Sequence, residues 1–321
     1  MIRGLLSTSL PSVAVEIAPR RVSAAVVAPR GGQMAVTAHA AEALPPGLVT
    51  PAVNAPNIAD IGALAVALQR VFERVGGRPS RVALAIPDSA AKVSLLRFEK
   101  VPSRAEDFDQ LVRWQMKKGA PFKLEDAQIS YTPGTSTGGE HEFVVVAVRR
   151  AIVREYESVV EAAGAQPGIV DISSFNVINT VLAGPHPPTT DWLLVHVTAE
   201  YASLAILRGQ DLVFFRNRSH QAEGSLADMV HQTAMYYEDR LSGGGLARVI
   251  LAGAGLLASD RTDGWRNADQ ARRMVEERLG THVEAIDPRG AAELVDRIVA
   301  SPELLDTLAP LVGLLVRERA A

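Results

Sequence analysis

The sequence contains no cysteine in its 321 residues. Disulfides, thiolate zinc sites, iron–sulfur clusters and cysteine nucleophiles are therefore excluded, and a cytoplasmic location fits this absence. Long apolar runs are absent as well. The candidates, Phe143–Val148 and Leu308–Val316, are much shorter than the roughly 20 residues that span a bilayer. We therefore expect no membrane-spanning segment.

The chain also lacks an excess of basic residues. Its formal net charge is -3 at pH 7, whereas binding to a nucleic-acid backbone normally requires a basic face. We therefore expect no nucleic-acid partner. What the sequence does have is ordinary globular composition, with 47% hydrophobic and 21% charged residues. Its length suits two domains or one large two-lobed body.

The first part of the chain predicts three strands followed by a helix. "VAVEIAPRRVSAAVV", residues 13–27, predicts two apolar strands joined by a short turn, and a third apolar stretch lies at Met34–Ala40. Apolar residues at helical spacing then run through Ile58–Val75 and stop at Gly76 and Gly77.

A segment of mixed character follows. "RVALAIP" and "KVSLLRFEKVP" have the length of strands, and Ser103–Glu106 has the spacing of a capping box that starts a helix. "APFKLEDAQISY", a glycine-rich turn at Gly134–Gly139 and "EFVVVAV" predict a hairpin, and Ile152–Ala163 predicts a further helix. We interpret residues from about 85 to about 165 as a small α+β subdomain inserted into the first lobe.

The second part of the chain repeats the order of the first. "DWLLVHVTAEYASLAILRGQDLVFFRNR" predicts three strands, Leu226–Leu241 predicts an amphipathic helix, and "RVILAGAG" predicts a strand that enters a glycine turn. Both parts thus open with three strands and a helix. Because an internal repeat constrains the architecture more than any single motif, we expect two lobes of the same design.

These features resemble the actin-like ATPase superfamily and, within it, the type IV pilus assembly protein PilM family. The similarity covers nearly the whole chain and rests on "VSLLRFEKVP" with "LVRWQMKKGAPFKLEDAQISY", on "MVHQTAMYYEDRLSGGGLARVILAGAG" and on "LAPLVGLLVR". The resemblance implies an α/β fold of duplicated actin-like (ribonuclease H-like) lobes. We place the first lobe, with its inserted α+β subdomain, at 1–185 and the second at 186–321, with a C-terminal helix that packs back on the first.

The same resemblance implies a function in binding. Members of the family are cytoplasmic proteins that bind the short N-terminal tail of the inner-membrane protein PilN and link the pilus motor to the membrane complex. The chain is then a scaffold of a type IV pilus or related secretion machine, held at the inner membrane by a PilN-like partner. We expect an extended peptide in a groove or along a sheet edge of the first lobe, with Trp114 and Phe122 as candidate partner-binding residues.

The first phosphate motif of the superfamily is degenerate in this chain. It should contain Asp-x-Gly, where the acid holds the magnesium shell and the glycine lets the backbone approach the phosphates. Here Glu16 and Ala18 stand at those positions, and Pro19 removes an amide donor. Arg20 and Arg21 complete the turn and could still attract an anion.

The other two nucleotide motifs differ in how well they are preserved. At the second phosphate loop His196 and Thr198 replace the acid and the glycine, although magnesium prefers oxygen ligands. The third motif, "AGAG", keeps Gly253 and Gly255, which could let an adenosine lie against the backbone. The candidate cofactor-binding residues of this degenerate nucleotide cleft are Glu16, Arg20, Arg21, His196, Thr198, Gly253 and Gly255.

We therefore expect a pseudo-ATPase with no catalytic residues, no metal site and no required cofactor. Without an acid at either Asp position, little remains to place metal-bound ATP or to activate water. The 7 histidines show no paired spacing of metal ligands.

Three alternatives stay open. The first is an active actin-like protein that binds ATP or ADP with magnesium and uses Glu16 in the role of the acid. The others are a type II secretion platform protein and a cell-division protein of the same superfamily. Those two families continue into a membrane helix, whereas this sequence stops directly after its last predicted helix, which argues against both.

Overall fold

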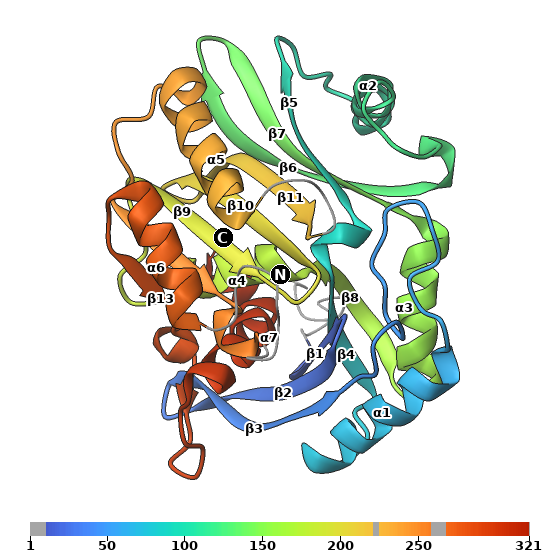
Figure 1. The fold of residues 1–321 in the computed structure, drawn as a ribbon. Coiled ribbons are helices and arrows are strands. Elements are labelled where there is room, and N and C mark those ends of the chain that lie inside the picture. The colour runs from blue at the N-terminus through green and yellow to red at the C-terminus, as the bar shows by residue number, and fades with distance from the viewer. Residues whose placement is uncertain (1–10, 221–224, 258–267, 321) are drawn as a thin grey trace.

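Three β-sheets organise the protein (Figure 1). The computed structural model describes residues 11–220, 225–257 and 268–320. The first large sheet has the strand order β14-β3-β2-β1-β4-β8. Its strands are β1 (Val13–Ala18), β2 (Arg21–Arg30), β3 (Gln33–Ala43), β4 (Arg81–Ile86), β8 (Gln166–Ile172) and β14 (Glu293–Leu294). Its helices are α1 (Ile61–Arg74), α3 (Arg150–Ala162), α4 (Ser173–Leu182) and α7 (Pro302–Ala320).

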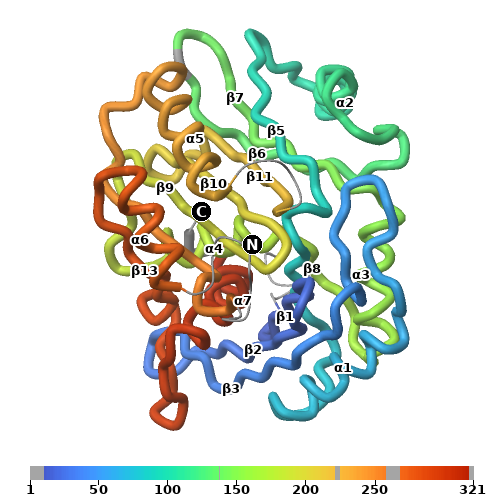
Figure 2. Tube along the Cα trace, viewed as in Figure 1, coloured from blue at the N-terminus to red at the C-terminus, as the bar shows by residue number. Residues whose placement is uncertain are grey.

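Successive side chains of a strand point to opposite faces of this sheet, and each face packs against different helices. Val15 and Ile17 of β1 share one core with α1 and α3. Ala14 of β1, with Ala83 and Ala85 of β4, faces α7 instead. These small side chains allow α7 to lie close to the sheet, and Figure 2 shows α7 beside β1, so that the first and last parts of the described chain share a core.

A close crossing joins α4 to α7. A Cβ atom on Gly313 of α7 would lie only 1.7 Å from the carbonyl oxygen of Asn176 in α4, so only glycine fits. Thr180 of α4 also donates a hydrogen bond of 2.6 Å to the carbonyl oxygen of Ala309. In the described part of the chain, no helix is long and apolar enough to cross a membrane.

The second large sheet has the order β11-β10-β9-β12-β13. Helices α5 (Leu226–Leu241) and α6 (Ala268–Leu279) share its core. The strands are β9 (Asp191–Val197), β10 (Tyr201–Arg208), β11 (Asp211–Ser219), β12 (Arg248–Ala252) and β13 (Val283–Ala285).

The two large sheets repeat one design, as the duplicated sequence pattern predicts. The order β3-β2-β1-β4-β8 of the first matches β11-β10-β9-β12-β13 of the second, strand for strand. In both, the first two strands pair antiparallel and the first strand also pairs with the fourth in parallel. The repeat places the β1–β2 turn and the β9–β10 turn at equivalent positions.

A small third sheet carries a core of its own. Its order is β5-β7-β6, with β5 (Lys92–Phe98), β6 (Ala127–Thr137) and β7 (Glu140–Arg149). Helix α2 (Ala105–Met116) covers one face, where the ring centroid of Phe108 lies 5.2 Å from that of Phe98 and 4.7 Å from that of Phe143. Helix α3, which the sequence pattern groups with this subdomain, packs against α1 through the core of the first large sheet.

The start of α2 differs from the sequence expectation. The pattern predicts that Ser103 caps the helix, but the N-cap is Arg104 and makes no side-chain capping bond. The helix begins one residue later than the box requires, so Glu106 falls too early in it to reach back. A capping box forms instead at α5, between Ser225 and Asp228.

Candidate functional site

The β1–β2 turn and the β9–β10 turn face each other between the two large sheets. Arg20 of the first turn donates through Nε to Glu200 Oε1 of the second at 2.7 Å. Both side chains remain partly exposed, so this ion pair contributes up to about 1 kcal/mol. The structure brings together at one cleft the predicted residues Glu16, Arg20, Arg21, His196 and Thr198.

Glu16 lies at the bottom of the cleft, but its carboxylate is already engaged. Its side chain is 5% exposed; Oε2 accepts from Arg21 Nη2 at 3.0 Å and Oε1 accepts from Ser173 Oγ at 3.0 Å. Both oxygens of the Glu16 carboxylate thus already accept from donors of the protein. Glu16 keeps the negative charge of the missing aspartate, and this charge forms an ion pair with Arg21.

Thr198 organises the turn that would otherwise offer amides to a phosphate. Its Oγ1 accepts from the backbone N–H of Glu200 at 3.3 Å and from that of Tyr201 at 3.1 Å, and it donates to the carbonyl oxygen of Tyr201 at 3.0 Å. Such a hydroxyl turn satisfies amides locally. The threonine that replaces glycine therefore accepts the hydrogen bonds of the backbone N–H groups of Glu200 and Tyr201.

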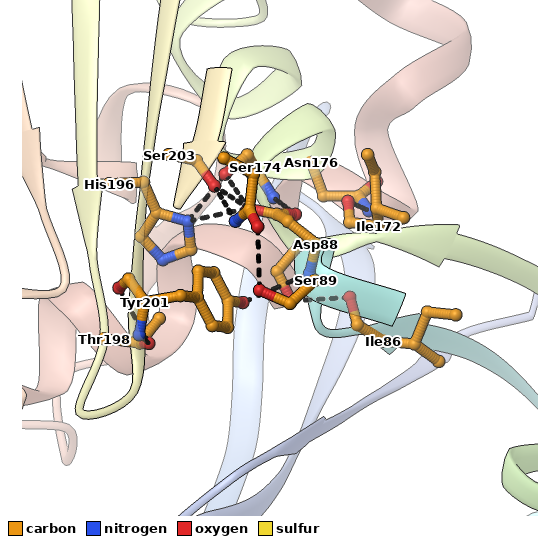
Figure 3. Close-up of polar contacts among 12 residues, drawn as sticks. Ile86, Asp88, Ser89, Ile172, Ser174, Asn176, His196, Thr198, Tyr201 and Ser203 are labelled. Atoms are coloured by element: carbon orange, nitrogen blue, oxygen red, sulfur yellow. Dashed lines mark hydrogen bonds and ion pairs between the residues drawn. The ribbon is translucent and has the colours of Figure 1, made fainter. Parts of the chain in front are cut away.

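His196 belongs to a buried polar network that joins the lobes (Figure 3). Its Nδ1 lies 2.8 Å from Ser174 Oγ, at the start of α4. Ser174 donates its hydroxyl hydrogen to Asp88 Oδ2 and its backbone N–H to Asp88 Oδ1 at 2.9 Å. Because this hydroxyl hydrogen is already used, Ser174 Oγ accepts from a protonated Nδ1 of His196, which fixes the tautomer.

Asp88 is the centre of this network and is fully buried in the short 3-10 turn after β4. Ser203 of β10 donates its hydroxyl hydrogen to Asp88 Oδ2 at 2.6 Å. The backbone N–H of Asp88 donates to the hydroxyl oxygen of Tyr201 at 3.2 Å. Burial by itself raises the pKa of the Asp88 carboxyl, but the contacts with His196 and Ser174 outweigh burial and hold that pKa below its ordinary value.

Further hydrogen bonds extend the network along the interface between the lobes, and each residue donates to the next one toward Asp88. Ser89 Oγ donates to Asn217 Oδ1 at 2.8 Å, Asn217 Nδ2 donates to Ser203 Oγ at 2.9 Å, and Ser203 donates to Asp88. Residues of the first lobe and of β9, β10 and β11 are thus linked by hydrogen bonds in which the hydroxyl hydrogens of Ser89, Ser174 and Ser203 each have an acceptor. A polar network of this kind favours a single arrangement of the two lobes.

The grouping of serine, histidine and aspartate in this network does not have the geometry of a nucleophilic triad. In a triad the serine and the acid bond to different ring nitrogens, whereas here Ser174 bonds His196 Nδ1 and the same serine bonds Asp88. Ser174 has no exposed surface. Its hydroxyl is a buried structural donor.

The glycine turn after β12 is occupied by the protein itself. Gly253 and Gly255 donate their backbone N–H groups to the two carboxylate oxygens of Asp306 in α7, at 2.7 and 2.6 Å. Both glycines are required by close approach. A Cβ on Gly253 would lie 2.0 Å from the carbonyl oxygen of Val197, and one on Gly255 would lie 2.9 Å from Asp306.

Little room is left between these groups. The cleft measures about 50 Å³, whereas small-molecule sites usually measure about 300–1,000 Å³. Burial raises the pKa of the Asp306 carboxyl, although the two glycine amides oppose this effect. The three motifs therefore meet in space as the sequence predicts, and Glu16, Thr198 and the two glycine amides bind groups of the protein. Arg21 Nε and Glu200 Oε2 are buried without a hydrogen-bond partner in the described part of the chain. Among the described residues, no group of histidines and acids is arranged to hold a metal ion.

A more open groove of about 270 Å³ lies between the small sheet and β8. β8 is an edge strand of the first large sheet, and its Ile169 and Val170 form one wall. The opposite wall comes from β6 and β7 and consists of Gln128, Ser130, Thr132, Val144, Val146 and Val148. These positions alternate with those that pack on α2, so the groove and α2 lie on opposite faces of the small sheet.

One end of this groove carries opposite charges. Arg317 Nη1 of α7 lies 3.5 Å from Asp171 Oδ2, and Asp171 Oδ1 accepts from the backbone N–H of Ile172 at 2.8 Å. Burial raises the pKa of the Asp171 carboxyl, although the amide and Arg317 both lower it. The groove thus combines apolar walls, exposed hydroxyl and amide groups, and a charged end.

A second cavity, of about 520 Å³, lies beside the proline-rich segment 184–190 and β13. Its charged side chains bind each other: Arg248 donates to the carboxylate of Glu284 at 2.9 and 2.7 Å. Asp287 is likewise held by Arg289. The charged groups here have partners within the protein.

The two predicted partner-binding residues do not line the groove beside β8. Trp114 projects from α2 and is 65% exposed, while Phe122 is half-buried against the aromatic core of the small subdomain. Both lie on the α2 side of the small sheet. Their role in partner binding stays a prediction.

A family model described as type IV pilus assembly protein PilM matches residues 14–240. The chain belongs to this family. Among solved structures, a PilM-PilN type IV pilus biogenesis complex is similar to it with a TM-score of 0.77 at 19% identity, covering 97% of this chain and 99% of the other. The fold is thus the actin-like α/β fold, as expected from the sequence.

Two other solved structures are similar at lower TM-scores. The cytoplasmic domain of EpsL, an inner-membrane component of the type II secretion system of Vibrio cholerae, has a TM-score of 0.47 at 12% identity, covering 75% of this chain and 81% of that one. A protein of actin-like ATPase fold from Bacteroides thetaiotaomicron has a TM-score of 0.49 at 9% identity, covering 88% and 94%. No curated protein matches the sequence.

Sequence reasoning missed three residues of this region: Asp88, Ser174 and Asp306. Asp88 follows the apolar strand "RVALAIP" almost directly, and a lone acid after a buried strand is a signal that could have been used. Asp306 gave no signal, because an acid in an amphipathic helix ordinarily faces water. Its partners lie 51 and 53 residues away in the chain.

Proposed function

We propose that this protein is a cytoplasmic scaffold of the type IV pilus assembly platform that binds the N-terminal tail of a PilN-like inner-membrane protein. The observation that carries the proposal is the groove beside β8. Membership of the PilM family and the similarity to a PilM-PilN complex support it. The partner would hold the protein at the cytoplasmic face of the inner membrane.

The groove suits a peptide in extended conformation. Among the described strands β8 pairs with β4 alone, so its other edge carries backbone groups that an added strand can use. Side chains of such a strand would alternate between the wall of β8 and that of β6 and β7. The apolar part of the wall, such as Val144 and Val146, supplies burial, while Ser130 and Gln128 offer hydrogen bonds.

A titration with a synthetic peptide tests this proposal. The peptide has the sequence of the cytoplasmic tail of the PilN-like protein from the same organism, and binding is measured to the full chain and to Ser130→Arg. Ser130 is exposed in the groove, so the arginine fills the path of the peptide without entering a core. We expect the dissociation constant to rise at least about tenfold.

The matched control is Gln110→Arg, which adds the same charge at an exposed position of α2 on the other face of the small sheet. The affinity of this control variant for the peptide should equal that of the unsubstituted chain. Equal losses in both variants would show a charge effect, and no loss in Ser130→Arg would place the peptide outside the groove. Either result contradicts the proposed binding site.

We also propose that the protein does not hydrolyse ATP. The residues of the cleft do not fit a magnesium–ATP complex. Glu16 is joined to Arg21, the amides of the second turn are taken by Thr198, and Asp306 holds the amides of the glycine turn. Phosphoryl transfer depends on placing the metal and the phosphates, and these groups are already committed elsewhere.

Equilibrium titration with magnesium and ATP tests this second part. We expect no binding at micromolar nucleotide and no release of phosphate. Micromolar binding with a turnover that Glu16→Gln abolishes would establish the active ATPase instead. That variant keeps an acceptor for Ser173 and removes only the charge, so loss of folding is not its expected effect.

A further inference from the structure

The lysines of this protein are confined to one part of the chain. The sequence has 33 lysines and arginines together, and arginines occur throughout its length. All lysines lie in the small subdomain or directly beside it: Lys92, Lys100, Lys117, Lys118 and Lys123. Most basic residues of the chain are thus arginines, and lysine occurs in a single region.

The two residue types also differ in what they contact. Every ion pair that the structure records among the described residues uses an arginine or a histidine as its cation, and none uses a lysine. Arginine suits fixed pairs with a carboxylate because its guanidinium is a rigid fork. Lysine is a strongly hydrated point charge on a flexible stem, which suits attraction to a charged surface without fixed partners.

Three of these lysines lie close in sequence to the exposed tryptophan near the end of α2. Lys118 Nζ lies 5.9 Å from the centroid of the Trp114 ring, a cation–π contact, and Lys117 and Lys123 are exposed nearby in sequence. Residues 110–124 contain no acidic residue. We call Trp114, Lys117, Lys118 and Lys123 the Trp114 surface.

The segment that carries the Trp114 surface is fixed by hydrogen bonds. The backbone N–H groups of Gly119 and Ala120 both donate to the carbonyl oxygen of Met116, at 3.0 Å. Arg113 donates to the carbonyl oxygen of Leu124 at 3.1 Å and so joins α2 to the segment that leads into β6. The lysines and Trp114 therefore lie on a defined protrusion of the small subdomain.

We propose that the Trp114 surface binds the headgroup region of an anionic membrane directly. Tryptophan combines an apolar ring with a polar N–H and suits the boundary between headgroups and acyl chains, while the lysines attract anionic lipids. The occupant is a lipid surface because the cations here are lysines that form no ion pair with a described carboxylate, whereas the ion pairs among the described residues use arginine or histidine. The contact adds a second attachment to the one that the proposed peptide supplies, and it lies on the opposite face of the small sheet.

Co-sedimentation of the purified full chain with vesicles tests the proposal. The vesicles contain phosphatidylglycerol and phosphatidylcholine, or phosphatidylcholine alone. We expect binding only to the anionic vesicles, and weaker binding at high salt. The double variant Lys117→Gln with Lys118→Gln should bind them about thirtyfold more weakly, since each lysine near an anionic surface contributes about a factor of five. Trp114→Ala should also weaken binding, at unchanged net charge.

The matched control neutralises two exposed arginines of α6, as Arg272→Gln with Arg273→Gln, and changes net charge by the same amount. It should bind anionic vesicles as the unsubstituted chain does. Equal weakening in both double variants, or no binding by the unsubstituted chain, would overturn the proposal; the latter would leave an acidic protein as the occupant.

Two further readouts distinguish a lost membrane contact from a loss of folding and from damage to the peptide site. Lysines at a helix C-terminus also stabilise the helix, so the melting temperature of the lysine variant is measured; weaker vesicle binding at an unchanged melting temperature supports a membrane contact. Vesicle binding that falls only in step with the melting temperature overturns it. Peptide affinity of the lysine variant should stay unchanged, so failure here and failure of the proposed peptide site are distinguishable.

Discussion

The cleft between the large sheets and the groove beside β8 contain similar groups: carboxylates, arginines, hydroxyls and a strand end. They differ in where these groups find their partners. In the cleft, Glu16, Thr198 and Asp306 are satisfied by the chain itself, and about 50 Å³ remains. Beside the groove, which measures about 270 Å³, the outer edge of β8 pairs with no other strand of the described residues.

In the function proposed above, the actin-like fold keeps the shape of a nucleotide site and binds its partner elsewhere. Within the cleft, Glu16 accepts from Arg21 and Ser173, and Asp306 accepts the amides of Gly253 and Gly255. The ion pair between Arg20 and Glu200 joins the two turns across the cleft. Three predictions test this comparison between a cleft that stabilises and a groove that binds.

The largest effect is expected for Asp88→Ala in the buried network. The backbone N–H of Ser174 and the hydroxyls of Ser174 and Ser203 all lose their acceptor inside the protein. We expect the free energy of unfolding at pH 7, measured with urea, to fall by about 3 kcal/mol or more. Asp107→Ala, on the exposed side of α2, is the control and should change stability by less than about 0.5 kcal/mol.

The same comparison has a defined pH dependence. Because the folded state holds the pKa of Asp88 below its ordinary value, the stability that this carboxylate contributes is present above the unfolded pKa. It is lost as the pH falls through the folded pKa. The difference between the unsubstituted chain and Asp88→Ala should therefore shrink in acid; a difference that grows in acid would contradict the assigned charge state.

A smaller effect is expected for Asp306→Ala. The amides of Gly253 and Gly255 lose their acceptors, and we expect a loss of about 2 kcal/mol in the free energy of unfolding. Titration with magnesium and ATP should still show no micromolar binding, because Glu16 and Thr198 remain engaged. If this variant does bind ATP, the cleft is a nucleotide site that the Asp306 side chain blocks. The proposed difference between a cleft that stabilises and a groove that binds would then be wrong.

The smallest effect, and one of opposite sign, is expected for Asp171→Asn at the end of the groove. Burial raises the pKa of Asp171 in the folded state, so its ionised form costs stability above that pKa. We expect the variant to gain less than about 1 kcal/mol at pH 7. The gain should disappear as the pH falls below the unfolded pKa. A loss of stability at pH 7 would show that the ion pair with Arg317 dominates.

Much of the fold followed from local patterns. The expected third strand at Met34–Ala40 is β3, and the expected helix at Ile58–Val75 is α1, capped by Asp60, whose side chain accepts from Ala63. Such elements are predictable because alternation and helical spacing record which face is buried. The Ser103 cap was wrong because a shift of one residue changes which amides a side chain can reach, and local pattern does not fix that shift.

The candidate site was predictable in its members but less so in its interactions. The cleft residues were found from the duplicated strand–turn–strand pattern, which puts equivalent turns at equivalent places. The role of Trp114 and Phe122 in partner binding stays a prediction, and their place was not predictable, because aromatic residues in one short stretch look alike whether they face a groove, a core or water. The register of β6 with β7 and the core that these strands share with α2 show that both residues lie on the α2 side of the small sheet.

The sequence by itself determined the two repeated lobes, the inserted segment and the loss of acid and glycine from the phosphate turns. These are properties of residue type and order along the chain. The tertiary structure alone decided that Asp306 holds the glycine amides, that Asp88 joins the lobes and that β8 lies at the edge of its sheet among the described strands. The reason is physical: these contacts join residues that are tens to more than a hundred positions apart, and their partners are chosen by packing.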